Sequence, residues 1–342
     1  MKSFASDNYA SVHPRILKSI EKANKGHAKA YGYDPYSEEL QEIIQDLFGK
    51  GASAFPVFNG SGANVIALKS LCKSYEAVLC SDVSHINVDE CGAAEQLVGS
   101  KLIDVPTQQG KLTPEALSPF IRNYGNEHQV QAKVLNLTQT TERGTVYSLQ
   151  ELKALGAFAK KNAIKVSMDG ARFSNAVATL KVKPVEIIKS AKVQVLSLGG
   201  TKNGLMLGEL VVVFNPQVAD EMKFYRKQYL QLSSKMRFIS AQFVEYFKNN
   251  LWIQNALHSN EMAQLLKREL QKFSEIQITE EVAANVVFVK VPRFLIEPLQ
   301  KKFPFYVWDE HLNECRWMCS FDTSPSDVKS FAREISKLLK MH

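Results

Sequence analysis

The stretch KVQVLSLGGTKNGLMLGELVVVFN, residues 192–215, decides the fold class of this chain. Its two apolar runs, VQVLSL and ELVVVF, enclose a loop of small residues that contains a single lysine, Lys202. The first run is apolar on both faces, as strands are in a parallel sheet that helices cover on either side. The stretch therefore predicts a strand, a loop and a second strand, with Lys202 at the edge of a sheet.

Other apolar runs precede this stretch, at 53–58, 76–81, 101–106, 132–138 and 163–169. Segments of helical periodicity lie between several of them, for example at 62–75 and 148–162. Strands that alternate with helices are typical of an α/β fold in which helices cover both faces of the sheet. We therefore predict a large α/β domain with a mostly parallel seven-stranded sheet between helices.

The pattern changes after Pro216, where a long helical region extends to about residue 273. Strand-like runs at 284–292 and 315–321 follow, and a helix at 324–340 ends the chain. This order is typical of a smaller α+β unit. The predicted organisation is an N-terminal arm at 1–20, a large domain at 21–249 and a small C-terminal domain at 250–342.

The composition is that of an ordinary globular protein. The 342 residues are 45% hydrophobic and carry a net charge of +7 with acids and bases interleaved, which disfavours a nucleic-acid partner. The five cysteines form no CxxC and no histidine pair has zinc-site spacing, so we expect no disulfide framework and no metal. The start lacks the apolar segment of a secretory signal and no apolar run could cross a membrane. We therefore expect a cytoplasmic protein.

Three features lie where predicted strands end or a helix begins. Asp169 closes the run at 163–169, Lys202 follows the next strand, and Gly60-Ser61-Gly62 opens a helix. Ligands of open α/β sheets bind beyond the carboxyl ends of the strands. The free N–H groups and the dipole at a helix N-terminus favour an anion such as a phosphate.

Each feature alone has an ordinary explanation: a tight turn, a helix cap or a solvated lysine. The glycine loop lacks the third glycine of GxGxxG, and GGTKNG is not a Walker A loop. Together, they are an amine able to form a Schiff base, a carboxylate able to keep a pyridine nitrogen protonated, and a phosphate cradle. These are the three fixtures that pyridoxal 5′-phosphate requires, so we expect that cofactor.

The chain also resembles a known family. The segments FNGSGANV (58–65), SHINVDECGAAE (84–95), MDGARFSNA (168–176) and LGGTKNGLMLGE (198–209) occur in the order found in the threonine aldolase and β-eliminating lyase group. The resemblance covers about residues 4–325, and DGAR followed by GGTKN is its most specific part. It implies the aspartate-aminotransferase-like fold of the fold type I enzymes that use pyridoxal phosphate.

The resemblance also implies roles for particular residues. The implied cofactor residues are Lys202 as the Schiff-base lysine, Asp169 at the pyridine nitrogen, Gly60 and Ser61 at the phosphate, His85 stacked over the ring, and Arg172 beside it. The implied substrate residues are Arg172 and Arg316 at the carboxylate, Ser6, and Tyr31 lent by a neighbouring subunit. His128 lies where the family often has a second histidine at the pocket mouth. His85 could instead be a helix cap, Tyr31 a packing residue and His128 plain surface.

The implied reaction is retro-aldol cleavage of L-threonine or L-allo-threonine to glycine and an aldehyde. Lys202 carries the cofactor, and the base stays open between His85, His128 and a water that they hold. The implied assembly is a homotetramer with shared pockets, to which Lys227 and Arg237 are candidate cross-subunit contacts.

Some positions depart from the family pattern. Asp89 replaces a frequent tyrosine, QTTE at 139–142 replaces ENTH, and SSKMR at 233–237 replaces GGGMR. Because the substrate surroundings differ, the alternatives are β-elimination, transamination, or cleavage of another 3-hydroxy amino acid such as phenylserine. A non-catalytic binding protein would have lost a cofactor fixture, and all of them are present in the sequence.

Overall fold

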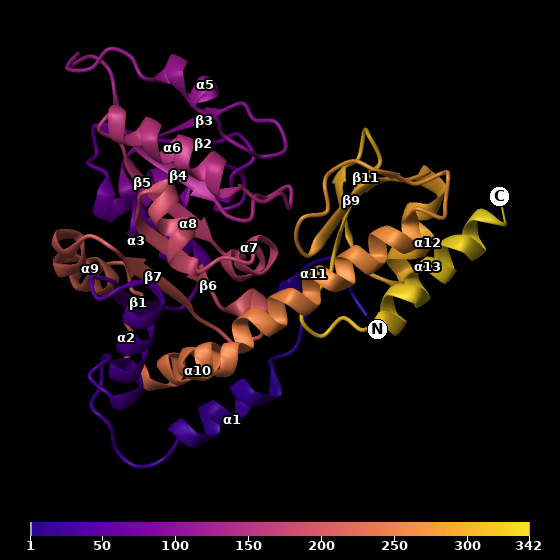
Figure 1. Ribbon diagram of the computed structural model, residues 1–342, viewed down its shortest axis with the longest axis horizontal. Helices are drawn as coiled ribbons and strands as arrows, with labels where there is room; N and C mark the ends of the chain where they lie inside the picture. Colours follow the sequence, from indigo (N-terminus) through magenta and orange to yellow (C-terminus); the bar gives the residue numbers. More distant parts are fainter. Residues whose placement is uncertain (1, 342) are drawn as a thin grey trace.

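Seven strands form one sheet in the computed structural model, which describes residues 2–341 (Figure 1). The strands are β1 (Ser53–Val57), β2 (Glu76–Ser81), β3 (Lys101–Val105), β4 (Gln131–Thr138), β5 (Lys165–Gly170), β6 (Val193–Gly199) and β7 (Glu209–Val213). Their order is β1–β7–β6–β5–β4–β2–β3. Neighbours from β3 to β6 pair in parallel, whereas β7 is antiparallel to both β6 and β1. The predicted mostly parallel seven-stranded sheet is confirmed.

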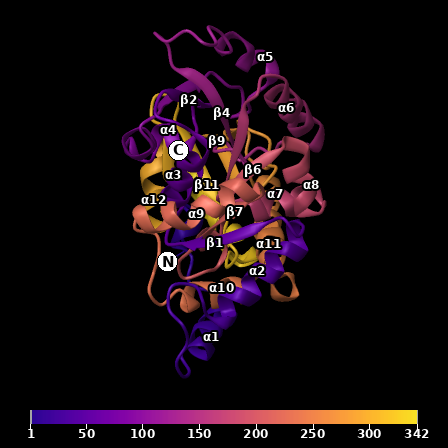
Figure 2. The same ribbon diagram turned by 90° about the vertical axis from the view of Figure 1, so that its left-hand side faces the viewer.

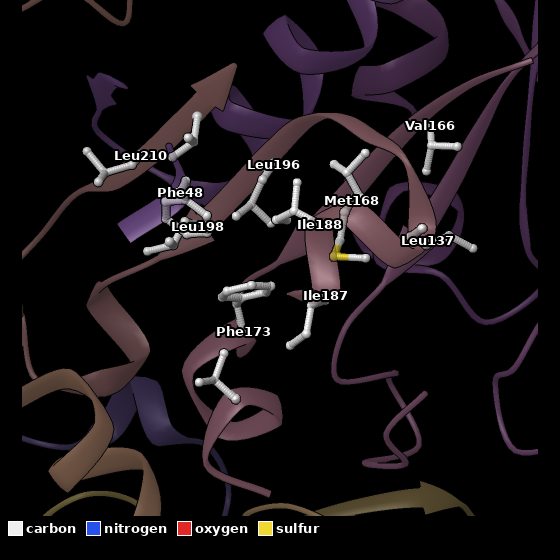
Figure 3. Packing of buried hydrophobic residues seen from close by; sticks show 14 of the residues in the cluster. Phe48, Leu137, Val166, Met168, Phe173, Ile187, Ile188, Leu196, Leu198 and Leu210 are labelled. Atoms are coloured by element: carbon white, nitrogen blue, oxygen red, sulfur yellow. The ribbon is translucent and has the colours of Figure 1, made fainter. Parts of the chain in front are cut away.

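Helices cover both faces of this sheet, because successive side chains of its buried strands point to opposite sides. Met168 and Leu196 pack with Ile187 in one apolar layer, which Figure 3 shows, whereas Val195 belongs to the other layer. The helices of the first layer are α2 (Pro35–Phe48), α6 (Leu149–Lys161), α8 (Pro184–Ala191) and α10 (Arg237–Phe247). The second layer contains α3 (Gly60–Leu71) and α9 (Pro216–Gln228). Figure 2 shows α3 on one side of the strands and α6 and α8 on the other.

The other helices of this part are α1 (Pro14–Ala23), α4 (His85–Val88), α5 (Pro114–Leu117) and α7 (Phe173–Leu180). Side chains cap several of the helices that begin near strand ends. Asn59 accepts a hydrogen bond from the N–H of Gly62 at the start of α3. Ser148 and Glu151 form a capping box at the start of α6, which satisfies N–H groups that a helix cannot bond internally.

The C-terminal part has its own sheet and core. Its four strands, in the order β10–β11–β9–β8, are all antiparallel. They are β8 (Gln277–Ile278), β9 (Val286–Lys290), β10 (Tyr306–Asp309) and β11 (Glu314–Met318), and the helices are α11 (Leu251–Leu270), α12 (Arg293–Lys302) and α13 (Pro325–Leu339). The long helix α11 runs from α10 across to this sheet and packs against both α7 and α13 (Figure 1). The predicted smaller α+β unit is therefore present.

The first residues belong to the C-terminal part as well. Phe4 is fully buried in that core. Its N–H donates to the carbonyl of Pro304 at 2.8 Å, and its carbonyl accepts from the N–H of Met318 at 2.8 Å. The segment predicted to be an irregular arm therefore extends the small sheet region before the chain enters α1. Phe4 therefore completes the core of the C-terminal part.

A short loop of the large part, residues 141–145 after β4, packs against the small sheet of the C-terminal part. Arg143 donates to Glu314 at 2.9 and 3.1 Å and to Glu280 at 2.8 Å, and its guanidinium lies 4.4 Å from the ring centroid of Phe288. The next residue, Gly144, has a φ of +74°, and a Cβ built there would lie 2.1 Å from Cγ1 of Val286. The loop is therefore held against the small sheet by charge and by close backbone approach.

Replacing Gly144 by alanine should destabilise the fold by about 2–4 kcal/mol, because left-handed backbone strain and overpacking against Val286 add together. Urea unfolding at neutral pH measures the change. Gly125→Ala is the matched control: its φ is +79°, yet nothing lies within 4 Å of the added Cβ. Equal losses of stability in the two variants would contradict the proposed contact with Val286.

Within residues 2–341, no helix combines the length and the hydropathy that a membrane span requires. The same residues contain no cluster of three or more histidine, cysteine or acidic side chains able to hold a metal ion.

Candidate active site

Two adjoining cavities lie at the carboxyl ends of β4, β5 and β6. The inner cavity has an empty volume of about 530 Å³, and the outer one has about 1310 Å³. Asp169, Gly60 and Ser197 line only the inner cavity, whereas Arg316 and Ser6 line only the outer one. The residues that line both are His85, Glu142, Arg172 and Lys202. The reacting part of a ligand that spans the two cavities would lie among these four side chains.

Lys202 lies in a short 3-10 turn, Thr201–Asn203, just after β6. Asn203 anchors this turn, because its amide donates to the hydroxyl of Tyr246 and to the carbonyl of Trp252, both at 2.8 Å. Burial lowers the pKa of the Lys202 amine, and the nearby positive charge of Arg172 lowers it further. A lowered pKa increases the neutral fraction of the amine, which is the nucleophilic form.

Asp169 lies at the end of β5, next to Lys202, because β5 and β6 are adjacent parallel strands. Its side chain is buried, with 5% of its surface exposed. One carboxylate oxygen accepts from the N–H of Ala171 and the other from the amide of Asn64, both at 2.9 Å. The carboxylate is therefore held rigidly at the wall of the inner cavity.

Asn64 and Glu90 connect Asp169 to His85. The Asn64 amide donates to Glu90 at 2.9 Å as well as to Asp169, and Nδ1 of His85 lies 2.8 Å from the same Glu90 oxygen. Glu90 is buried, so this carboxylate acts in a poorly screened environment. Its hydrogen bond raises the pKa of the His85 imidazole. The chain of contacts fixes the ring of His85 and favours its protonated form.

We expect Glu90→Gln to lower the pKa of His85, because an amide keeps the shape of the side chain and removes the negative charge that favours the imidazolium. A pH titration of the His85 ring protons by NMR measures this shift. Glu95→Gln is the control, since Glu95 is exposed and accepts from the N–H of Leu102 instead. An unchanged titration of His85 in Glu90→Gln would show that Glu90 does not control its charge.

The opposite end of the inner cavity is the start of α3. Gly60 and Ser61 are its first residues, and Gly60 lines the cavity. The N–H groups in the first turn of a helix have no acceptor within the helix. They can therefore donate to a bound anion. A Cβ at Gly62 would lie 2.4 Å from the side-chain amide of Gln231, so a larger residue there would have to displace this flexible side chain.

The two predicted arginines have different surroundings. Arg172 donates two hydrogen bonds to Asp7, at 2.7 and 2.8 Å, and Asp7 is buried. Arg316 lies in the outer cavity with its Nε unpartnered within the described residues, and burial lowers its pKa to about 10. Arg316 is therefore the guanidinium with more donors free for a ligand carboxylate.

The other predicted residues are placed as follows. Ser6 lines the outer cavity. Tyr31 is 47% exposed beside Lys227 and lines neither cavity, so its role across subunits stays a prediction. His128 lies in an exposed loop between α5 and β4 and lines neither cavity of this chain, so its place at the pocket mouth also stays a prediction. An exposed loop of polar residues has no apolar pattern that would dock it on the sheet edge.

Sequence reasoning missed several residues that the fold brings into the site: Asp7, Asn64, Glu90, Glu142 and Glu209. Glu209 is buried and accepts from the N–H of Gly200 at 2.6 Å, so it supports the turn that carries Lys202. Burial raises the pKa of Glu209 to about 7. The departure of QTTE from the family pattern was a signal for Glu142, and the other positions gave no local signal of a site role.

A family model, curated relatives and a solved structure all indicate the same family for this chain. The model of the family described as "Beta-eliminating lyase" matches residues 3–293. A protein of Pseudomonas sp. (strain NCIMB 10558) named "Low specificity L-threonine aldolase" is 39% identical over 99% of this chain and 98% of its own length. A Pseudomonas aeruginosa protein of the same name is 39% identical over 98% of this chain and 97% of its own. The solved structure of Leishmania major threonine aldolase superposes with a TM-score of 0.94 at 27% identity, covering 99% of this chain and 100% of that one.

Proposed function

Because this chain belongs to the β-eliminating lyase family, we propose that it binds pyridoxal 5′-phosphate and cleaves L-threonine and L-allo-threonine to glycine and acetaldehyde. The observation that carries the proposal is the meeting of Lys202, Asp169 and the start of α3 in one cavity. An amine, a carboxylate and an anion-binding helix end are the groups that this cofactor requires.

The inner cavity fits the cofactor in a second respect. The hydroxyl oxygens of Thr140 and Ser197 line it, are buried, and have no hydrogen-bond partner within residues 2–341. Buried polar atoms are nearly always hydrogen-bonded, so these two hydroxyls suit a polar ligand in the cavity. Lys202 would hold the cofactor covalently, Asp169 would hold its ring nitrogen, and Gly60 and Ser61 would bind its phosphate.

The bound cofactor would supply an electron sink conjugated to the substrate Cα. Asp169 keeps the positive charge that this sink needs, which is electrostatic stabilisation of charge that develops during the reaction. Arg316 grips the substrate carboxylate and thereby sets which bond at Cα faces the sink. Val88 and Trp308 add apolar surface to the wall of the outer cavity.

The direct test is to mix the purified protein, supplied with pyridoxal 5′-phosphate, with L-threonine and with L-allo-threonine. We expect acetaldehyde and glycine in equal amounts. Formation of a keto acid without acetaldehyde would contradict aldol cleavage and favour β-elimination or transamination. Comparing the two diastereomers shows whether the pocket distinguishes the configuration at Cβ.

A larger 3-hydroxy amino acid such as phenylserine is a second candidate substrate. The outer cavity has Val83, Val307 and Trp308 in its wall, which offer apolar surface to an aromatic ring. Benzaldehyde release from phenylserine, compared by kcat/KM with acetaldehyde release from threonine, ranks the two substrates.

We also propose a homotetramer in which neighbouring subunits share pockets, and a cytoplasmic location. Tyr31 and Tyr33 are large exposed aromatic residues on the face that also carries Arg237, which supports a subunit contact there. All five cysteines are free, and Cys91 is exposed, which suits a reducing compartment. Sedimentation equilibrium measures the assembly.

A further inference from the structure

Four residues line both cavities, and the family resemblance implies roles for three of them: His85, Arg172 and Lys202. The fourth is Glu142, which ends the QTTE segment that departs from the family pattern. We propose that Glu142 is the catalytic base that removes the proton from the substrate β-hydroxyl. This inference rests on the proposed function, because the hydroxyl exists only on a 3-hydroxy amino acid.

The surroundings of Glu142 leave one carboxylate oxygen available. Oε1 accepts from the N–H of His85 and from the hydroxyl of Thr138, both at 2.9 Å. Oε2 has no hydrogen-bond partner within the described residues. Two donors on one oxygen hold the side chain in place, and the other oxygen keeps its lone pairs for a proton.

The other acid–base groups near the cavities are less suited to this step. His85 is bound to Glu90, which favours the imidazolium, and an imidazolium cannot accept a proton. Asp7 is paired with Arg172. Glu209 lines only the inner cavity and Asp89 only the outer one, so neither lies where the cavities meet.

The charge of Glu142 is also suited to proton transfer near neutral pH. Burial, followed by the charge of Asp169, raises the pKa of the Glu142 carboxyl to about 7. The charged or titratable groups that surround it in the cavities are His85, Glu90, Asp169, Arg172, Lys202, Glu209, Asp89, Tyr306 and Arg316. A base whose pKa lies near the working pH combines a large ionised fraction with sufficient basicity.

The next residue in the loop, Arg143, holds Glu142 in place. Arg143 is fixed on the small sheet by Glu314 and Glu280. The same sheet carries Arg316 on β11, two residues after Glu314. Arg143 is therefore a positioning residue that keeps Glu142 in register with the arginine that grips the substrate carboxylate.

The proposed step balances as follows. Glu142 takes the hydroxyl proton, and the O–H electron pair becomes the second C–O bond of the aldehyde. The Cα–Cβ bond breaks, and its electron pair remains on the Cα side. A proton then returns to Cα, which yields glycine, and Glu142 gives up its proton when the aldehyde leaves.

The test is Glu142→Gln, which keeps the acceptor oxygen for His85 and Thr138 but cannot take a proton. We expect kcat for threonine cleavage to fall about 100-fold, and the rise of activity with pH near 7 to disappear. The absorption band of bound cofactor and the exchange of the glycine α-proton with D₂O, which needs no base at a hydroxyl, should be unchanged. The matched control is Glu76→Gln, since Glu76 is equally a buried glutamate but lies at the far end of β2, bound to the N–H of Lys73.

A further readout does not depend on activity. The raised pKa of Glu142 means that folding disfavours its ionised form, so above pH 7 the native protein bears a cost that the neutral glutamine lacks. The unfolding midpoint of Glu142→Gln at pH 8 should therefore be no lower than that of the unmodified protein, and infrared spectra between pH 6 and 8 should lose one titrating carboxyl band.

Each result is decisive. Cleavage by Glu142→Gln at the original rate with the original pH profile would overturn the proposal. Equal loss of cleavage, glycine exchange and cofactor absorbance would also overturn it, since that pattern indicates a structural role. If the unmodified protein exchanges the glycine proton but releases no aldehyde from any 3-hydroxy amino acid, the proposed function itself fails, and the role of Glu142 fails with it.

Discussion

Lys202→Ala is expected to lose the absorption band of covalently bound cofactor and to lower the cleavage rate about 10⁴-fold or more. The reason is that no other lysine lines either cavity among the described residues. Burial lowers the pKa of the Lys202 amine, which increases its neutral, nucleophilic fraction. Spectra before and after dialysis, and steady-state release of acetaldehyde, measure the two effects.

A chemical readout makes this prediction independent of turnover. Reduction of the cofactor-loaded protein with borohydride, followed by proteolysis and mass spectrometry, should place the added mass on Lys202. Lys202→Arg is the companion variant, because it keeps a positive charge in the cavity but cannot form the covalent bond. Retention of the cofactor band in either variant would remove Lys202 from the mechanism.

The second large effect is expected for Asp169→Asn, which should lower kcat about 10³-fold. The substitution removes the negative charge that would face the cofactor nitrogen. It also places an amide near the Asn64 amide, which now donates to Asp169 at 2.9 Å. Both consequences weaken the electrostatic support of the ring, so we also expect weaker cofactor retention. Steady-state kinetics and equilibrium dialysis measure them separately.

Asn64→Leu separates charge from hydrogen bonding at this position. It removes the donor to Asp169 and to Glu90 while both carboxylates remain. We expect a smaller loss of kcat than for Asp169→Asn, because the charge opposite the ring nitrogen is kept. An equal or larger loss would mean that the contact with Asn64, rather than the negative charge, is the essential property of Asp169.

Much of the site could be predicted because it depends on strand ends. Asp169 and Lys202 are 33 positions apart in the sequence, yet they lie at the ends of two successive apolar runs, which form the neighbouring strands β5 and β6. The carboxyl ends of parallel neighbours meet at the same edge. The start of α3 was recognisable from its small residues, since only a turn with little side-chain bulk lets a ligand approach the backbone.

The remaining parts of the site depend on contacts that no local pattern encodes. Asp7 reaches Arg172 across 165 positions of sequence, and Asn64 reaches Asp169 across 105 and Glu90 across 26. At His128 a family position suggests a site residue, and the loop that carries it is exposed in this chain. The role of a polar residue depends on the residues that contact it in the fold, and the local sequence does not specify these contacts.

By itself, the sequence determined the seven-stranded α/β fold and the amine, the acid and the helix start of the inner cavity, because hydrophobic periodicity and small-residue loops follow directly from residue type. Only the tertiary structure decided that Glu142 lies where the two cavities meet, that Glu90 bears on His85, and that the first residues complete the C-terminal core. These arrangements come from long-range packing, in which burial sets the charge of a carboxyl group and the neighbouring chain segments set its partners.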